Sequence, residues 1–285
     1  MEKQNIYQDI SARTGGEIYL GVVGPVRSGK STFIKRFMEL LVLPEIKDEN
    51  ERKRTMDELP QSGTGKMVMT TEPKFIPKEA AELPMEDMKI KIRLIDCVGF
   101  MIPGAGGNLE NGQERLVKTP WFDYEVPFTK AAEFGTRKVI GKPFLVLVNS
   151  ERPYSKATQA LTEKLSKEYN TSVMAVNCDQ LRQEDILEIL KNVLLEFPLS
   201  SVGFYLPKWV ETLRDDHWMK KSVLDLVKEF MTDKNKMKDL YQKVFPSNDY
   251  IESGKIEKIH MDTGKVDVKI QIRDSYYYDI LSDLT

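Results

Sequence analysis

The sequence predicts an α/β protein: a domain with a mostly parallel sheet, followed by a helical segment and the start of a smaller α+β domain. Two observations support this prediction. As far as Pro198, short apolar runs rich in β-branched residues alternate with segments whose apolar residues recur at helical spacing, which is typical of a sheet covered by helices. Beyond Pro198 the pattern changes to a largely helical stretch and then to two alternating runs around a glycine-containing turn.

The composition is that of a globular protein. Of the 285 residues, 41% are hydrophobic and 30% are charged, which is enough apolar material for one large domain or for two. The formal net charge of −2 gives no general attraction to nucleic acid, so no nucleic-acid partner is expected. The polar N-terminus and the lack of any run of about 18 apolar residues favour a cytoplasmic protein.

The two cysteines, Cys97 and Cys178, lie far apart within apolar runs. We expect both to be buried, reduced thiols. The two histidines, His217 and His260, share no metal-ligand spacing with them, so the sequence predicts no zinc site.

The first strand is predicted at residues 17–24, a short apolar, β-branched run of the kind found in buried parallel strands. This run leads directly into a glycine-containing loop that extends to Ser31. Apolar residues then recur at helical spacing until Pro44 ends the predicted helix. These apolar residues are Phe33, Ile34, Phe37, Leu40 and Leu41. Strand, glycine loop and helix follow one another in the order that a phosphate-binding loop requires.

The rest of the first domain alternates loops with regular elements. The polar, proline-containing residues 45–84 are expected to form a long functional loop, in which the charge run 47–58 is a solvated helix face or loop. Residues 89–99 predict a strand that ends at Asp96, and residues 100–138 are expected to be loop-like. The remaining predicted elements are a strand at 143–149, a helix at 158–169, a strand at 173–177 and a helix at 183–197.

These patterns divide the chain into three parts. We expect an α/β domain at residues 1–198, a helical extension at 199–245 and the beginning of a second domain at 246–285. The last part contains a predicted β-hairpin, residues 255–273, around a turn at 262–265. Too few residues follow the hairpin to complete a sheet, so we expect the chain to be a piece of a longer protein.

The glycine loop matches the spacing G-x-x-x-x-G-K-[S/T] of a P-loop, which binds nucleoside triphosphates. Its glycines allow backbone N–H groups to curl around the β-phosphate, and the helix N-terminus adds its positive end. We expect Lys30 to bridge the β- and γ-phosphates and Ser31 to bind Mg²⁺. The residues expected to contact the nucleotide are Gly24, Pro25, Val26, Arg27, Ser28, Gly29, Lys30, Ser31, Thr32 and Gly99.

Asp96 ends an apolar strand, where a Walker B carboxylate would hold Mg²⁺ through a water. Gly99 completes a D-x-x-G pattern, in which the glycine N–H contacts the γ-phosphate and the following loop acts as a switch. Thr70 and Thr71 lie where a sensor threonine would close over Mg²⁺ and the γ-phosphate, although a plain pair of threonines at the start of a strand is the alternative. The predicted catalytic residues are Lys30, Thr70, Thr71 and Asp96, and the predicted magnesium ligands are Ser31, Thr71 and Asp96.

The residues after the third predicted strand bear on the choice of base. Guanine-specific P-loop proteins carry N-K-x-D at this position, but here the residues are Asn149, Ser150, Glu151 and Arg152. Arg152 carries only hydrogen-bond donors and cannot accept from guanine N1–H and N2–H₂ as an aspartate does. We therefore expect ATP in preference to GTP, unless Glu151 shifts register and accepts those bonds.

Hydrolysis is also expected to differ from that of signalling GTPases. Phe100 stands where a water-orienting glutamine often follows D-x-x-G, so hydrolysis through a glutamine at that site is excluded. Charge stabilisation would come from Lys30, Mg²⁺ and a sensor threonine. Arg27, or an arginine of a neighbouring subunit, could act as an arginine finger; the alternative is that Arg27 is a solvent-facing loop residue.

Several runs of residues together resemble the stage IV sporulation protein A family. The phosphate-loop run is generic, whereas the others are specific to that family. The runs, which extend over nearly the whole chain, are residues 24–32, 69–75, 95–99, 119–121, 134–140 and 207–211.

The resemblance implies a fold and a function that the composition does not show. Members of this family of endospore-forming Firmicutes are cytoskeletal-type relatives of translation-factor GTPases that hydrolyse ATP. The family's Walker A lysine falls on Lys30, its Walker B aspartate on Asp96, and its sensor threonines on Thr70 and Thr71. Residues 1–198 would then be the ATPase domain, and residues 246–285 would begin the middle domain.

The resemblance also implies a cellular role. Hydrolysis in the family drives self-assembly into a static polymer on the mother-cell side of the forespore, as the basal layer of the spore coat. The implied partners are further copies of the chain, other spore-coat proteins, and the amphipathic peptide stage V sporulation protein M, through which the membrane surface is recognised. Family members continue beyond Thr285, where membrane anchoring is thought to lie.

Two other functions stay open from the sequence. A GTP-driven molecular switch is opposed by Arg152 and by the balanced charge. A structural scaffold that binds nucleotide without turnover is opposed by the intact Lys30, Asp96 and threonine pair, because a decayed site would be free to lose them.

Overall fold

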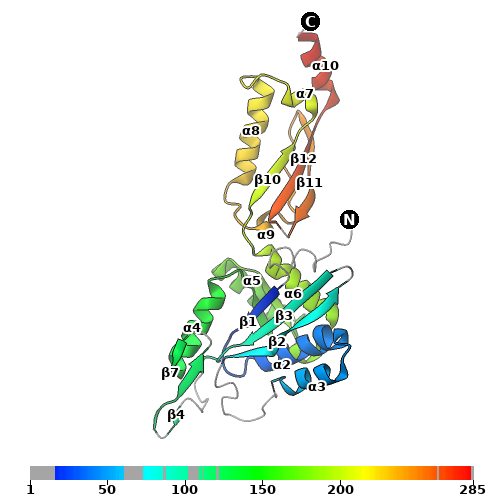
Figure 1. Ribbon diagram of the computed structural model, residues 1–285. Coiled ribbons are helices and arrows are strands. Elements are labelled where there is room, and N and C mark those ends of the chain that lie inside the picture. Colours follow the sequence, from blue (N-terminus) through cyan, green and yellow to red (C-terminus); the bar gives the residue numbers. More distant parts are fainter. Residues whose placement is uncertain are drawn as a thin grey trace. The chain divides into compact units, whose positions relative to one another are not determined.

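The computed structural model describes residues 17–60, 73–85, 88–101, 109–110, 112–119, 122–261 and 263–283. The chain divides into two compact units, Met1–Val193 (unit 1) and Leu194–Thr285 (unit 2), whose elements are labelled in Figure 1. The predicted sensor threonines Thr70 and Thr71 lie outside the described residues, as does the turn residue Asp262.

Unit 1 contains a three-stranded sheet in the order β1-β3-β2. β1 (Glu17–Val22) and β3 (Met88–Asp96) pair in parallel, and Val22 lies opposite Asp96 at the carboxyl ends of both strands. The predicted first strand and the predicted strand ending at Asp96 are therefore confirmed. The apolar residues Ile92 and Leu94 of β3 are almost completely buried, which explains why this run is apolar.

The third strand of this sheet, β2 (Lys74–Met85), lies in a segment that the sequence predicted to be a loop. That prediction was wrong for residues 74–84. β2 pairs antiparallel with β3 at the edge of the sheet and contains Pro77 and Pro84, with an irregularity in register between Ile76 and Ala81. An edge strand tolerates proline because a missing backbone N–H on its outer side interrupts no pairing.

The helices after the first loop follow the predicted order. α2 (Lys30–Phe37) continues as a π-helical turn, η1 (Met38–Val42), and a 3₁₀ turn, η2 (Leu43–Glu45), where Pro44 ends the helical path as predicted. α3 covers most of the charge run and is largely exposed, as expected of a solvated helix face. It spans Glu49–Asp57, and the Asp48 side chain caps it by accepting from the backbone N–H of Glu51 at 2.8 Å.

The segment 100–138 is more regular than the loop that the sequence predicted. It contains four short strands and a helix: β4 (Leu109–Glu110), β5 (Gln113–Glu114), β6 (Leu116–Thr119), β7 (Phe122–Pro127) and α4 (Phe128–Ile140). The strands form two small antiparallel pairs, β4-β5 and β6-β7. Strands of two to six residues carry too few alternations to be recognised by periodicity, which is why the prediction was wrong here.

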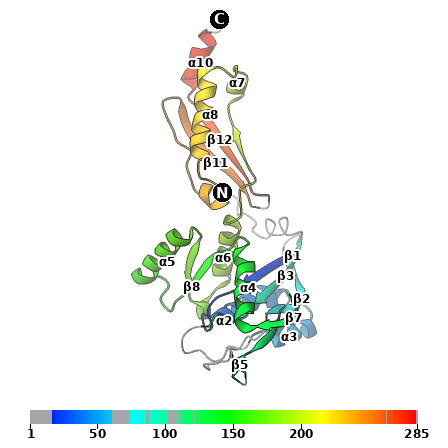
Figure 2. The same cartoon turned by 90° about the vertical axis from the view of Figure 1, so that its left-hand side faces the viewer.

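The remaining predicted elements of unit 1 are confirmed. β8 (Val146–Asn149) and β9 (Val173–Val176) form a parallel pair, and Figure 2 shows α5 and α6 on opposite sides of these strands. α5 spans Lys156–Tyr169, α6 spans Gln183–Leu195, and a 3₁₀ turn, η3 (Cys178–Gln180), follows β9. Two parallel pairings, β1-β3 and β8-β9, agree with the predicted mostly parallel α/β fold.

Unit 2 is built on a three-stranded sheet in the order β10-β12-β11. The predicted hairpin is confirmed as β11 (Ile251–His260) and β12 (Lys265–Ile272), which pair antiparallel. β10 (Ser201–Tyr205) pairs in parallel with β12, although the sequence placed it in a helical segment. The helices of the unit are α7 (Lys208–Glu211), α8 (Trp218–Met231), α9 (Met237–Leu240) and α10 (Asp274–Asp283).

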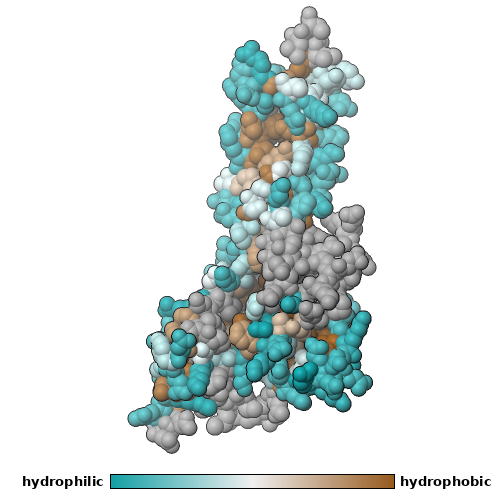
Figure 3. Space-filling model, in the orientation of Figure 1, coloured by the Kyte–Doolittle hydropathy of each residue, from teal (hydrophilic) through white to brown (hydrophobic). Residues whose placement is uncertain are grey.

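One hydrophobic cluster joins the two parts of unit 2 that the sequence analysis separated at residue 245. It includes Val223 and Phe230 of α8 together with Val266 and Val268 of β12, all buried. α8 and β10 also contribute partly buried hydrophobic residues, and Figure 3 shows an apolar area over these two elements. The helical extension and the hairpin therefore form one folded unit around a shared core.

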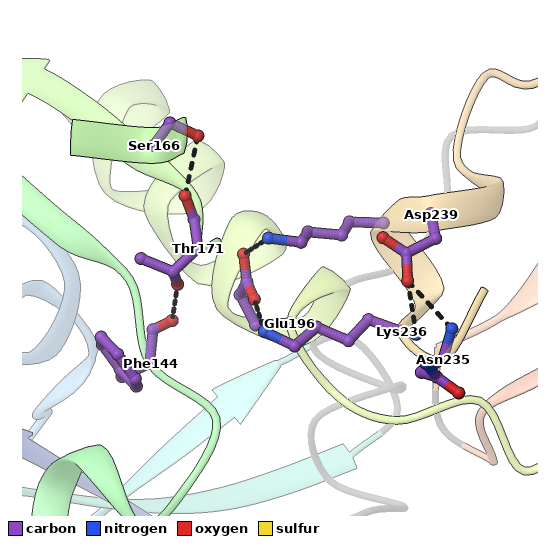
Figure 4. Close-up of polar contacts among 8 residues, drawn as sticks. Phe144, Ser166, Thr171, Glu196, Asn235, Lys236 and Asp239 are labelled. Atoms are coloured by element: carbon purple, nitrogen blue, oxygen red, sulfur yellow. Dashed lines mark hydrogen bonds and ion pairs between the residues drawn. The ribbon is translucent and has the colours of Figure 1, made fainter. Parts of the chain in front are cut away.

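A buried carboxylate binds two lysines near the start of unit 2. The Glu196 side chain is 1% exposed, and its oxygens lie 2.7 Å from Lys236 Nζ and 2.8 Å from Lys238 Nζ (Figure 4). Asp239 accepts hydrogen bonds from the backbone N–H groups of Asn235 and Lys236 in the same turn. Because a buried charge is costly unless it is paired, the two lysines tie the α9 region to Glu196.

Replacing Gly254 by alanine is expected to destabilise unit 2. A Cβ at Gly254 would lie 2.7 Å from Cγ of Phe245, a ring that is 1% exposed, so the core has to shift. We expect Gly254→Ala to lower the free energy of unfolding by about 1–3 kcal/mol, measured by urea denaturation with tryptophan fluorescence. Ser253→Ala, on the neighbouring β11 position, is the control. An unchanged denaturation midpoint in Gly254→Ala would contradict this packing.

Candidate functional site

The glycine loop connects β1 to α2 and contains three residues with positive φ. Gly24 has φ 155°, Arg27 has φ 69° and Gly29 has φ 95°. A side chain at Gly29 is disfavoured by this φ, and its Cβ would also lie 2.5 Å from Nδ2 of Asn149. Among the described residues no side chain caps the N-terminus of α2, so its first N–H groups point toward the loop. This is the geometry in which a loop and a helix end bind phosphate.

Lys30, the first residue of α2, folds back over the loop. Its ammonium group donates hydrogen bonds to the carbonyl oxygens of Gly24 at 3.1 Å and Pro25 at 2.8 Å. Burial lowers the pKa of Lys30, and the negative charge of Asp96 opposes this lowering. The structure therefore holds a partly desolvated cation at the mouth of the loop, where interaction with an anion is strong.

The backbone after Asp96 is bonded to the loop. Cys97 N–H donates to Val22 O at 3.2 Å, Phe100 N–H donates to Gly24 O at 3.2 Å, and Val26 N–H donates to Phe100 O at 2.8 Å. These bonds place Gly99 directly against Lys30. A Cβ on Gly99 would lie 2.7 Å from Lys30 Nζ and 3.0 Å from the backbone nitrogen of Val26, so a side chain here would displace the lysine and press on the loop backbone.

Ser31 and Asp96 line a cleft of about 570 Å³ beside the loop. The Asp96 residue is 2% exposed. A serine hydroxyl and a carboxylate are hard oxygen ligands that suit Mg²⁺, which commonly takes only one or two protein carboxylates together with phosphate oxygens and water. In the described part of the chain no three histidine, cysteine, aspartate or glutamate side chains gather into a metal site of their own. The residues present therefore fit a magnesium ion held jointly with a nucleotide.

Asn149, at the end of β8, connects the loop to the turn after β9. Its Nδ2 donates to Ser28 O at 3.3 Å, and its Oδ1 accepts from the backbone N–H of Cys178 at 3.1 Å. In the sequence, Asn149 stands out only as the first of the four residues compared with N-K-x-D, and this bridge was not predicted. Its position at the carboxyl end of a predicted parallel strand was the available signal, since ligand sites of open α/β sheets lie at that edge.

The backbone N–H groups of the η3 turn are already engaged. Cys178 N–H bonds to Asn149, Asp179 N–H donates to Asn177 Oδ1 at 3.1 Å, and Gln180 N–H donates to Asn177 O at 3.0 Å. The turn therefore presents few free donors at this end of the site. Exposed carboxylate oxygens, such as those of Asp179, remain as acceptors.

The structure brings the loop residues, Asp96 and Gly99 together as predicted. Thr32 lies in the first turn of α2 and is half-buried, and Arg27 is exposed. Arg152 is also exposed, and its backbone N–H donates to Ser150 Oγ at 3.2 Å. Phe100 packs against a hydrophobic cluster below the loop, so its side chain serves packing.

Both cysteines are buried, as predicted. Burial, together with the nearby charge of Asp96, raises the pKa of Cys97 to about 12. Burial likewise raises the pKa of Cys178 to about 11, with a smaller contribution from Asp179. Neither thiol forms an appreciable amount of thiolate near neutral pH, which argues against a nucleophilic role for either.

A parallel strand, a left-handed glycine loop, a lysine over the loop and a buried acid at the end of the adjacent strand define a P-loop nucleoside-triphosphate-binding domain. Residues 1–141 and 138–198 match the family model for the ATPase domain of stage IV sporulation protein A, and residues 199–285 match the model for its middle domain. The chain therefore belongs to the stage IV sporulation protein A family.

Curated relatives agree with the family models. Stage IV sporulation protein A of Bacillus subtilis (strain 168) is 40% identical over an alignment 325 positions long, which covers 100% of this chain and 66% of that protein. The Bacillus anthracis protein is 38% identical with the same coverage, and the Clostridioides difficile (strain 630) protein is 38% identical, covering 98% of this chain and 65% of the relative. The chain thus spans about two thirds of the length of these relatives.

A solved structure, that of Methanosarcina barkeri Roco2 bound to GDP, also matches. It is 19% identical, has a TM-score of 0.28 and covers 62% of this chain and 50% of that chain. A likeness of this size carries no argument about the site. Among the described residues, no helix has the length and apolarity needed to span a bilayer.

Replacing Gly99 by alanine is expected to weaken nucleotide binding. The new Cβ would displace the Lys30 ammonium and press on the Val26 backbone, which cannot move without opening the loop. We expect Gly99→Ala to weaken the affinity for a fluorescent ATP analogue about tenfold or more, since such overpacking costs about 1–3 kcal/mol. Gly112→Ala, where the added Cβ meets nothing within 4 Å and only the positive φ of 79° is disfavoured, is the control for glycine strain outside the site and should bind normally. Equal affinities would contradict the close approach.

Proposed function

We propose that this chain binds ATP with Mg²⁺ and hydrolyses it, and that hydrolysis drives self-assembly into the basal layer of the spore coat around the forespore. The observation that carries the proposal is the Lys30 ammonium, held between the loop carbonyls and Gly99 beside the buried Asp96. Membership of an ATPase-domain family supports the nucleotide chemistry. The assembly step rests on the family resemblance.

The residues of the site have distinct parts in this mechanism. The Lys30 ammonium would exchange its two carbonyl partners for oxygens of the β- and γ-phosphates, while the loop N–H groups hold the β-phosphate. Ser31 and Asp96 would hold Mg²⁺, which neutralises charge on the phosphate oxygens. Gly99 would present its N–H to the γ-phosphate. Thr70 and Thr71 complete the proposed catalytic set, and Thr71 is a proposed magnesium ligand.

Two observations support a preference for ATP over GTP. Arg152 offers only donors where guanine needs an acceptor. In addition, the N–H groups of the η3 turn are engaged by Asn149 and Asn177, so guanine O6 would find few free backbone donors there. Adenine carries the N6 amine where guanine carries O6, so it needs an acceptor there instead, which the Asp179 carboxylate can supply.

The proposed partners are further copies of the chain, other spore-coat proteins and the amphipathic peptide stage V sporulation protein M, through which the chain would reach a membrane surface. The proposed location is the mother-cell side of the forespore. A GTP-driven switch and a nucleotide-binding scaffold without turnover are the alternatives. The first is opposed by the donors of Arg152, and the second by the complete set of Lys30, Asp96 and Gly99.

Phosphate release from ATP and from GTP, measured with Mg²⁺ at increasing protein concentration, tests the proposal. We expect release from ATP and little from GTP, and Lys30→Ala should abolish it because the phosphates lose their main cation. Lys164→Ala, which removes an exposed lysine of α5, is the control. A specific activity that rises with concentration would show that subunits complete one another's sites. Binding without cleavage would favour the scaffold, and a preference for GTP would favour the switch.

The base preference has a separate test in two substitutions. Asn177→Ala frees the Asp179 N–H as a donor for guanine O6, and Arg152→Asp supplies the missing acceptor. We expect the double variant to gain about tenfold in affinity for GTP relative to ATP, from about one restored charged hydrogen bond. Competition against a fluorescent ATP analogue measures the ratio. Asn192→Ala, which removes an exposed amide bonded within α6, is the control. An unchanged ratio in the double variant would contradict this account of base selection.

A further inference from the structure

The cleft that contains Ser31 and Asp96 also contains a lysine that no part of the proposed mechanism uses. Lys74, the first residue of β2, lines this cleft of about 570 Å³. Within the described part of the chain the Lys74 side chain makes neither a hydrogen bond nor an ion pair, and the residue is exposed. An unengaged cation beside a magnesium and phosphate site is where additional negative charge would be bound.

The register of the sheet sets the direction of Lys74. It lies directly opposite Asp96 in the antiparallel pairing of β2 with β3. Directly opposite residues project from the same face of a sheet, with their Cβ atoms about 5 Å apart. Ile76 and Leu94, the next pair on that face, are 3% and 0% exposed, so this face of the sheet is buried at that pair. Lys74 thus lies on the same face of the sheet as this buried pair, at the end of β2 that lines the cleft.

We propose that Lys74 contacts the γ-phosphate and supplies, from within the same chain, a catalytic cation of the kind that an arginine finger supplies elsewhere. The inference rests on the proposed ATP hydrolysis. Lys30 lies over the loop near the β-phosphate position, and Phe100 offers no polar group. Lys74 lines the cleft that contains Ser31 and Asp96, so it is placed to offset the negative charge spread over the γ-phosphate oxygens in the transition state.

A second lysine of the cleft provides a matched comparison. Lys78 also lines the cleft and is exposed, and its backbone N–H donates to Glu58 at 2.6 Å. It lies four residues further along β2, about 13 Å from Lys74 at the usual rise of an extended strand. The register irregularity between Ile76 and Ala81 separates it from the Asp96 end. Lys78 therefore shares the cleft and the charge but not the position.

Equilibrium binding of a non-hydrolysable ATP analogue (AMP-PNP) and of ADP tests the inference without depending on turnover. We expect Lys74→Ala to weaken AMP-PNP binding about tenfold and to leave ADP binding within about twofold, because only the analogue carries the third phosphate. The turnover number should fall as well. Lys74→Arg should restore much of the analogue affinity, and Lys78→Ala should behave as the parent.

The outcomes separate this inference from the proposed function. If the parent chain binds and cleaves ATP but Lys74→Ala binds AMP-PNP as tightly, the inference is wrong and the proposed function stands. If ADP and AMP-PNP lose affinity equally, or Lys78→Ala shows the same loss, Lys74 contributes only general charge and the inference is also wrong. A parent chain that binds neither nucleotide would overturn both. Lys74→Gln serves as a second variant if alanine prevents folding.

Discussion

The parallel pairing of β1 with β3 is the constraint on which the nucleotide site depends. Because Val22 lies opposite Asp96, the loops that follow the two strands leave the sheet at the same edge. The pairing continues as an isolated bridge between Pro25 and Phe100, which holds the chain after Asp96 against the glycine loop. A shift of one position in this register would turn Asp96 to the other face of the sheet and separate the acid from the loop.

Packing beneath the loop supports this pairing. Val26 of the loop is buried in a cluster with three residues from other parts of unit 1. These are Val98, which follows Asp96, Val117 of β6 and Phe128 of α4. Arg27, the next residue, adopts a left-handed conformation that disfavours a side chain. A strained loop keeps one shape only when its surroundings determine it, and the burial of Val26 does so here. The small hairpins and α4 therefore belong to the support of the site.

The sequence predicted correctly those elements whose pattern of residues lies within the element itself. The glycine loop, the strand ending at Asp96, α5, α6 and the hairpin of unit 2 each carry their own spacing or periodicity. The sequence did not predict the strands that form only because they pair with another strand of the sheet. β2 contains two prolines and reads as a loop, yet it forms because β3 offers an edge on which the missing N–H groups interrupt nothing. β10 is likewise ordered by its pairing with β12, which follows sixty residues later in the chain.

By itself the sequence determined the chemistry of this protein: the loop with Lys30 and Ser31, the acid at Asp96 and the glycine at position 99 follow from residue types at fixed spacing. Only the tertiary structure decided which other side chains meet them. Asn149 bridges the loop to the η3 turn, and Lys74 faces the cleft opposite Asp96. These positions depend on the register between strands that are distant in sequence, and register arises from the packing of whole elements, which no local pattern records.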